Sequence, residues 1–296
     1  MVNPARLASN VTHSPARQSM PYRPPELLRQ LHVLDFFELM GNQALAARVL
    51  QLHQSSVSRI VSGLAQQFDL NRNSDGCEVP DPLRYLRLAY RAHRMGDGVL
   101  RLASDPLFQP LLEGSSSLQP VPASFRSITE WVGLIQQGVI DGAIVAAPPP
   151  EQWVGEERPS WRGVRWIDLG QLELHLAIAA ADDQVVLVPA ADQAPLLHRQ
   201  LLERQWTLRS LGPRRHDRQD WQEIAARLDL ALPVAASLLP QQWLLQTKRR
   251  LQPLTPPLLA PLWLLMAEEA AVNSTVQHEV CRLQRRLLQA ENPHLN

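Results

Sequence analysis

Residues 44–64 read ALAARVLQLHQSSVSRIVSGL, and this stretch decides the fold of the first third of the chain. Apolar residues recur at helical spacing on both sides of a short polar break at His53-Gln54-Ser55, which predicts two short helices joined by a tight turn. The second helix has an apolar face formed by Val57, Ile60, Val61 and Leu64. Its other face carries Ser58 and Arg59, which we expect to be open to solvent.

The residues before this stretch add one more helix. A helical apolar pattern runs over 24–40, beginning at Pro24-Pro25 and ending before Gly41-Asn42, which are typical start and stop signals. The predicted order is therefore a helix over 24–40, a helix over 43–52, a tight turn and a helix over 56–68. Such an order is typical of a helix-turn-helix.

The pattern changes after a loop over 71–82 and one more amphipathic helix over 83–95. Strands are predicted over 99–103, 121–127, 142–147, 164–169, 172–179 and 185–188. Helices are predicted over 106–113, 129–138, 194–205 and 220–228, and the apolar residues 254–271 and 275–290 are helix-prone. Strands that alternate with helices indicate an α/β layer structure with a mainly parallel sheet.

The composition is typical of a soluble globular chain. Of 296 residues, 45% are hydrophobic and 20% are charged, and the formal net charge is zero. The longest apolar run, 256–267, is too short to cross a bilayer and is broken by Pro261. Residues 1–25 hold no apolar stretch of signal-peptide length, and we expect a disordered arm there. Two cysteines, Cys77 and Cys281, make neither a disulfide framework nor a zinc cluster, so we expect a cytoplasmic protein without a membrane partner.

The charges are unevenly distributed along the chain. Residues 1–96 contain 11 Arg against 7 Asp and Glu together. Four of these arginines cluster near the end of the region, at Arg84, Arg87, Arg91 and Arg94. A basic N-terminal part suits a polyanionic partner, although ordinary solvated helix faces would explain the small excess equally well.

From Leu31 to Leu64 the sequence resembles the winged helix-turn-helix of LysR-type transcriptional regulators. That family shows an apolar first helix, a Gly, an Ala-Ala pair, a Leu, a Gln, a small residue, Ser-Arg and a late Leu, in this order. The matching residues here are Gly41, Ala46-Ala47, Leu50, Gln54, Ser55, Ser58-Arg59 and Leu64. Further on, Gly98–Leu102 looks like the family's first sensor strand, and residues 134–144, LIQQGVIDGAI, are similar to its helix-Gly-Asp segment.

The resemblance implies an α/β protein with an all-α N-terminal part, in which a winged helix-turn-helix precedes a periplasmic-binding-protein-like sensor of two α/β subdomains. Its domains would be a disordered arm over 1–25, the winged helix-turn-helix over 26–82, a linker helix over 83–96 and an effector-binding regulatory domain over 97–296. A homodimer or tetramer is also implied. The sequence departs from the family in a much shorter linker helix and in a wing that reads Leu70-Asn71-Arg72-Asn73.

The implied function is that of a transcriptional regulator that binds double-stranded DNA, with helix 55–68 in the major groove, which admits one helix. The predicted DNA contacts are His53, Gln54, Ser55, Ser58, Arg59 and Arg72. Arg59 can bind guanine or a phosphate, Gln54 can bind adenine or a phosphate, and the serine hydroxyls suit phosphate oxygens. From spacing alone, a simple helix cap at Ser55 and a solvated helix face fit as well.

A small-molecule effector is expected where strands end and helices begin. The predicted contacts are Ser104, Asp105, Ser127 and Thr129. Helix caps would explain these residues equally well, and a carboxylate such as Asp105 would repel an organic acid. Without a catalytic motif, a nucleotide loop or metal-ligand spacing, we expect neither an enzyme nor a cofactor or metal. The alternative function is a ligand-binding or protein-interaction module whose helix-turn-helix does not bind DNA.

Overall fold

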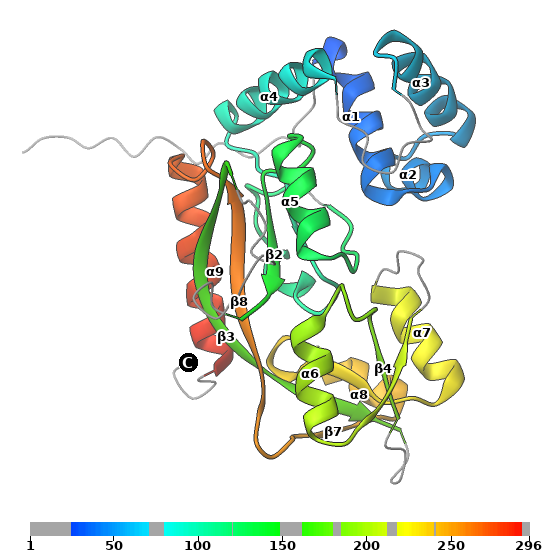
Figure 1. The fold of residues 1–296 in the computed structure, drawn as a ribbon, viewed down its shortest axis with the longest axis vertical. Coiled ribbons are helices and arrows are strands. Elements are labelled where there is room, and N and C mark those ends of the chain that lie inside the picture. Colours follow the sequence, from blue (N-terminus) through cyan, green and yellow to red (C-terminus); the bar gives the residue numbers. More distant parts are fainter. Residues whose placement is uncertain are drawn as a thin grey trace, which may run out of the picture.

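The computed structural model of this chain describes residues 25–70, 80–119, 121–148, 162–179, 185–211, 218–239 and 241–291. Helices of the N-terminal part lie at one end of the molecule, and an α/β part with two lobes makes up the rest (Figure 1). Residues 1–24 of the predicted arm over 1–25 lie outside the described residues, as does most of the predicted wing, including Arg72.

The N-terminal helices are α1 (Glu26–Met40), α2 (Gln43–Leu50) and α3 (Gln54–Gln67), which confirms the predicted order. Gly41 ends α1 in the left-handed conformation, with φ of 63°, and donates its N–H to the carbonyl of Phe37. The side chain of Asn42 then caps α2 by accepting the backbone N–H groups of Ala44 and Leu45. A tight turn at 51–53 leads into α3, and each of the three helices contacts the other two.

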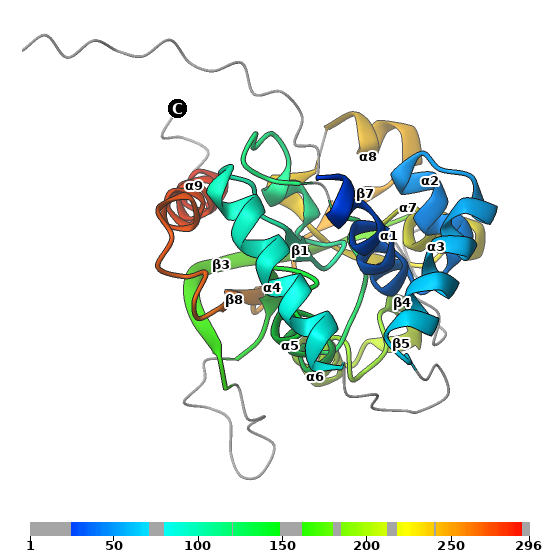
Figure 2. The same ribbon diagram turned by 90° about the horizontal axis from the view of Figure 1, so that it is seen from above.

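Helix α4 (Asp81–Gly96) connects the N-terminal helices to the α/β part. Seen from above, it lies across the top of the α/β part, with α1, α2 and α3 on one side of it (Figure 2). Leu83 and Tyr90 are buried on its inner face, together with three arginines described below.

The main sheet of the α/β part has six strands in the order β1-β2-β8-β3-β6, with β7 paired to β3. Its strands are β1 (Leu102–Ser104), β2 (Gly142–Ala146), β3 (Val164–Ile178), β6 (Leu232–Ala235), β7 (Arg250–Gln252) and β8 (Leu258–Ala267). A second sheet pairs β4 (Val185–Val188) with β5 (Thr207–Ser210). The long strands β3 and β8 run through both lobes (Figure 1) and therefore join them.

The helices of the α/β part divide between the lobes. The upper lobe, next to α4, holds the short 3₁₀ helix η1 (Gln109–Leu112), α5 (Ile128–Gln136) and α9 (Ser274–Glu291). The lower lobe holds α6 (Pro195–Glu203), α7 (Arg218–Leu228), the short 3₁₀ helix η4 (Ala236–Leu238) and α8 (Gln241–Thr247). This arrangement confirms an α/β protein with an all-α N-terminal part and two subdomains.

Several predicted elements are wrong, and each error has a physical cause. The sheet is mixed, because only the β1/β2 and β4/β5 ladders are parallel while β8 and β3 pair antiparallel to their neighbours. Within the run 254–271, residues Leu258–Ala267 form strand β8 instead of a helix. A continuous apolar run fits either structure, and here the pairing with β2 on one side and β3 on the other decides. The two strands predicted over 164–179 are one strand, β3, with an irregularity at Asp168/Gly170.

Two further predictions fail close to β1. Residues 121–127 form neither helix nor strand, although their apolar side chains are buried as in an extended segment. The predicted helix over 106–113 is reduced to a turn followed by η1, which starts next to Pro110. Of the described helices, none is long and apolar enough to cross a membrane.

Candidate nucleic-acid interface and ligand cavity

Helix α3 is held against its neighbours by one apolar face. Val57, Val61 and Leu64 on this face are buried. On α2, Ala46 and Ala47 are buried as well, and their small side chains allow the two helices to approach closely. The local sequence therefore fixes which side of α3 faces the protein and which faces solvent.

The opposite face of α3 is open. The side chains of Gln54, Ser55 and Arg59 are exposed, and Ser58 is half-buried. These residues are spaced as the pairs 54/58 and 55/59, which places them on one side of the helix. Helix α3 lies on the far side of α1 from α4 (Figures 1 and 2), so the α/β part does not cover this side.

The first turn of α3 is suited to an anion. His53 occupies the N-cap position without a side-chain hydrogen bond to the helix, and it is exposed. The N–H groups of the first turn therefore lack a side-chain cap and carry the positive end of the helix dipole. Among the described residues, no carboxylate forms an ion pair with Arg59. A phosphate group placed at this end of α3 would meet backbone N–H groups, hydroxyls and a guanidinium.

Three of the four arginines near the end of the basic region are not available to a polyanion. The prediction of a basic surface on α4 is therefore wrong for these three. Arg87, Arg91 and Arg94 are buried. The guanidinium of Arg87 binds Asp35 of α1 at 2.9 Å and Glu38 of α1 at 2.7 Å. Arg84 is exposed, as a residue on an ordinary solvated helix face would be.

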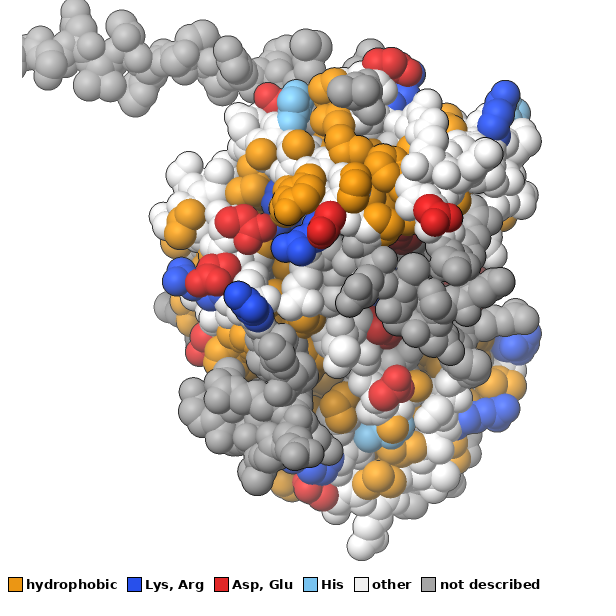
Figure 3. Space-filling view, turned by 45° about the horizontal axis from the view of Figure 1, so that its top comes forward, with side chains coloured by type: hydrophobic (Ala, Val, Ile, Leu, Met, Phe, Trp, Pro, Cys, Tyr) orange, Lys and Arg blue, Asp and Glu red, His pale blue; other side chains and the backbone are white. Residues whose placement is uncertain are grey.

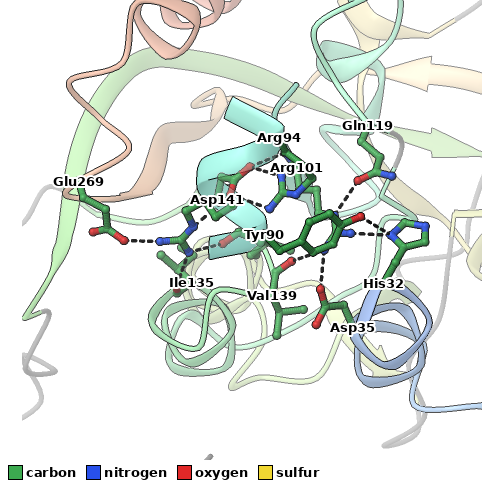
Figure 4. Close-up of polar contacts among 12 residues, drawn as sticks. His32, Asp35, Tyr90, Arg94, Arg101, Gln119, Ile135, Val139, Asp141 and Glu269 are labelled. Carbon is green, nitrogen blue, oxygen red and sulfur yellow. Dashed lines mark hydrogen bonds and ion pairs between the residues drawn. The ribbon is translucent and has the colours of Figure 1, made fainter. Parts of the chain in front are cut away.

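Two buried carboxylates organise the polar cluster between α1, α4 and the sheet (Figure 4). Asp35 accepts hydrogen bonds from Arg87 Nε at 2.9 Å and from Arg101 Nη1 at 2.7 Å. Asp141 accepts from Arg94 at 2.7 and 3.1 Å and from the backbone N–H of Arg101 at 2.7 Å. Since Asp35 belongs to α1 while Arg101 and Asp141 precede β1 and β2, this cluster ties the N-terminal helices to the α/β part.

The protonation of this cluster follows from its charges. Burial opposes ionisation of Asp141, but Arg94 and Arg91 outweigh it and hold the pKa of Asp141 below its usual value. His32 of α1 lies against Arg101, with Nδ1 at 2.6 Å from Arg101 Nη2. Burial, with the nearby Arg101 and Arg94, lowers the pKa of His32 to about 3. His32 is therefore neutral at neutral pH, and its Nδ1 accepts a hydrogen bond from Arg101.

A second contact joins α1 to the α/β part. Arg126, in the segment before α5, donates a hydrogen bond to the backbone carbonyl of Leu39, in the last turn of α1. It also donates to the hydroxyl of Ser124 at 3.0 Å and lies over the ring of Trp131. The end of α1 therefore rests on the segment that leads into α5.

A cavity of about 430 Å³, counted with its open mouth, lies between the two lobes. From the upper lobe it is lined by Asp105 and Phe108, which follow β1, by Phe125 in the segment before α5, and by Ala146 at the end of β2. From the lower lobe it is lined by α6 and the residues before it, and by the start of β8. Ligands bind commonly at the carboxyl ends of parallel strands, which is where β1 and β2 meet this cavity.

Of the predicted effector contacts, only Asp105 lines this cavity. Ser104 is buried beside it, and its hydroxyl has no hydrogen-bond partner among the described residues. Ser127 caps α5 in a capping box with Glu130, and Thr129 is exposed on α5. The role of these three residues toward an effector stays a prediction.

The buried polar cluster formed by Asp35, Asp141 and their arginine partners was not predicted from the sequence. Its signal was present, because Asp35 stands between apolar residues of a helix, and Arg87, Arg91 and Arg94 recur at the spacing of the buried face of α4. Within the described ranges no group of His, Cys, Asp and Glu could hold a metal ion.

No family model matches the sequence, and no curated protein matches it. Several solved structures are similar to it at low sequence identity. CbnR, a LysR family transcriptional regulator, is 15% identical, with a TM-score of 0.48 over 88% of this chain and 99% of that one. OxyR of Corynebacterium glutamicum is 17% identical, with a TM-score of 0.45 over 92% of this chain and 95% of that one.

A third solved structure, ArgP from Mycobacterium tuberculosis, is 16% identical, with a TM-score of 0.45 over 87% of this chain and 96% of that one. At these identities and TM-scores, the similarity does not transfer a function to this chain. The function must be judged on the chain's own residues.

Proposed function

We propose that this protein is a DNA-binding transcriptional regulator of the LysR type. The observation that carries the proposal is the open face of α3, where His53, Gln54, Ser55, Ser58 and Arg59 lie together at the N-terminal end of a helix in a helix-turn-helix. A helix that presents short polar side chains and an arginine in this way fits the major groove. The proposal assigns no catalytic step to the chain.

In this proposal, the cavity between the lobes binds a small-molecule effector. Its binding would change the relative placement of the lobes, and the contacts of Arg126 and of the buried polar cluster would pass that change to α1. Because α1 packs against α3, the position of the DNA-binding face would follow.

The proposed oligomer is a homodimer or a tetramer, joined through α4. Hydrophobic side chains gather on the top of the molecule (Figure 3). On the outer face of α4, Tyr85 is 64% exposed and Leu86 is 38% exposed. If a second copy covered this face, the dimer would carry two recognition helices, and each could bind one half of an operator.

The test is a gel shift with duplex DNA from upstream of the protein's own gene, repeated over a range of salt concentrations. Wild type should bind, and its affinity should fall as salt rises because bound arginines release counterions. Arg59→Ala should weaken binding and reduce the slope of log K against log salt by about 0.9. The matched control is Arg285→Ala, which removes another exposed arginine, on α9, and should leave both quantities unchanged.

The alternative function is a ligand-binding or protein-interaction module with a helix-turn-helix that does not bind DNA. Under that alternative, the wild-type protein ignores duplex DNA at low salt, and Arg59→Ala has no effect. Either result would contradict the proposed regulator.

A further inference from the structure

The cavity between the lobes has an unusual charge composition for a site that would bind an organic acid. Among the described residues that line it, Asp105 is the only one with an ionisable side chain. The other lining side chains are apolar, apart from Gln193 and Gln200. A carboxylate ligand would therefore meet a carboxyl group and no cation, which disfavours its binding.

Asp105 has no cationic partner among the described residues, and the indole of Trp131 is the one group that favours its ionised form. Its side chain is 7% exposed, and its Oδ1 forms no hydrogen bond with any described residue. The arginine of the neighbouring segment, Arg126, is bound to Leu39 and Ser124 instead. A buried carboxyl group without a cationic partner is costly to ionise, so a carboxyl group that lines a cavity in this state would gain from a cationic ligand group.

We propose that this cavity binds a small organic cation, an ammonium group on an apolar body, with Asp105 as its counter-ion. The proposal rests on the effector cavity of the proposed function and names the class of ligand for it. The ammonium group would lie against the carboxyl group of Asp105 at the cavity wall, and the apolar body would contact the apolar walls.

The remaining lining groups suit such a ligand. Phe108 and Phe125 line the cavity on the side of Asp105, and aromatic rings attract cations. Gln200 uses its amide N–H₂ on the carbonyl of Leu259, at 2.8 Å, which leaves its side-chain oxygen as an acceptor for an N–H donor. The cavity therefore offers acceptors to a ligand head that carries donors.

The binding should also depend on pH in one direction. Burial raises the pKa of Asp105 well above its ordinary value, against the opposing effect of the Trp131 indole. Arg126 is the charged group that lies over Trp131. A cation favours the ionised carboxylate, so its binding releases a proton from Asp105 and tightens as the pH rises.

The experiment uses the full chain and titration calorimetry with three probes of similar shape: phenethylamine, a cation; 2-phenylethanol, which is neutral; and 3-phenylpropionate, an anion. We expect phenethylamine to bind at least about tenfold tighter than the alcohol, because only the amine forms a charge-assisted hydrogen bond with Asp105. The anion should not bind. Asp105→Asn should remove this preference and retain the binding of the alcohol. Asp192→Asn, an exposed carboxyl beside the lining residue Gln193, is the matched control and should change nothing.

A second measurement covers the case that Asp105→Asn does not fold. In wild type, the affinity for phenethylamine should rise as the pH rises, whereas the affinity for the alcohol should stay constant. Equal or tighter binding of the alcohol or the anion, no binding of any probe, or unchanged amine binding in Asp105→Asn would overturn the ligand class. Each of these results is independent of DNA binding, which the Arg59→Ala gel shift tests on its own.

Discussion

Asp35 is the residue whose loss tests most sharply how the N-terminal helices are fixed to the α/β part. Its carboxylate is fully buried and binds Arg87 Nε at 2.9 Å and Arg101 Nη1 at 2.7 Å, and both guanidinium groups are fully buried as well. The substitution Asp35→Asn keeps the shape of the side chain but leaves two buried cations without their shared counter-charge. Breaking a buried ion pair by removing one partner costs about 3–5 kcal/mol, so we expect a loss of this size in the free energy of unfolding.

Urea unfolding of Asp35→Asn can be followed by two signals that report different parts of the chain. All eight tryptophans lie at or after residue 131, so tryptophan fluorescence reports the α/β part. Far-ultraviolet circular dichroism also reports α1, α2 and α3. We expect the dichroism transition of the variant to begin at lower urea than its fluorescence transition, because the N-terminal helices lose their attachment first.

The matched control is Glu26→Gln, at the start of α1. Glu26 pairs with Arg29 at 3.1 Å, but the two side chains are 80% and 63% exposed. An exposed pair contributes less than about 1 kcal/mol, so this variant should unfold like wild type. An Asp35→Asn variant that also stays within about 1 kcal/mol of wild type, with coincident transitions, would refute the stabilising role of the cluster.

Three further variants test separate features of the fold. Burial raises the pKa of Asp105, so its ionisation opposes folding at neutral pH; Asp105→Asn should raise the melting temperature at about pH 8, and the gain should vanish near pH 4. The pKa of His32 is lowered from 6.5 to about 3, so neutral His32 stabilises the fold fully above about pH 6.5, and this stabilisation is lost as the pH falls toward 3. In His32→Gln, the urea midpoint of unfolding should therefore change less with pH over that range than in wild type. A Cβ on Gly142 would lie 2.5 Å from the carbonyl oxygen of Leu265, so Gly142→Ala should lower the stability in urea by about 1–3 kcal/mol or more.

The N-terminal helices could be predicted from the sequence because their signals are local. Gly41 and Asn42 act as stop and cap within a few residues of the helices that they separate, and the apolar face of α3 is read directly from its period. The exposure of Arg59 follows from the same period. For this reason Gln54, Ser55 and Arg59 are exposed on α3 and Ser58 is half-buried, while their contact with DNA stays a prediction.

The α/β part was harder to predict because its elements depend on distant neighbours. Residues 254–271 are rich in leucine and favour a helix locally, but β8 is completed by antiparallel pairing with β2 and with β3. The burial of the arginines of α4 could not be predicted for the same reason. Their charge suggested an exposed face, and only the carboxylates of Asp35 and Asp141, far apart in the sequence, make their burial favourable.

Site-specific crosslinking from α3 to DNA tests the central claim most directly. Ser62→Cys places one thiol on the exposed face of α3, one turn beyond Ser58, in a chain whose Cys77 and Cys281 are replaced by Ser. With a photo-reactive group on that thiol, we expect a crosslink to duplex DNA that disappears at high salt, and no crosslink from Arg285→Cys on α9. Equal crosslinking from both positions, or none from Ser62→Cys while the protein is bound to DNA, would contradict the assignment of α3 as the DNA-binding helix.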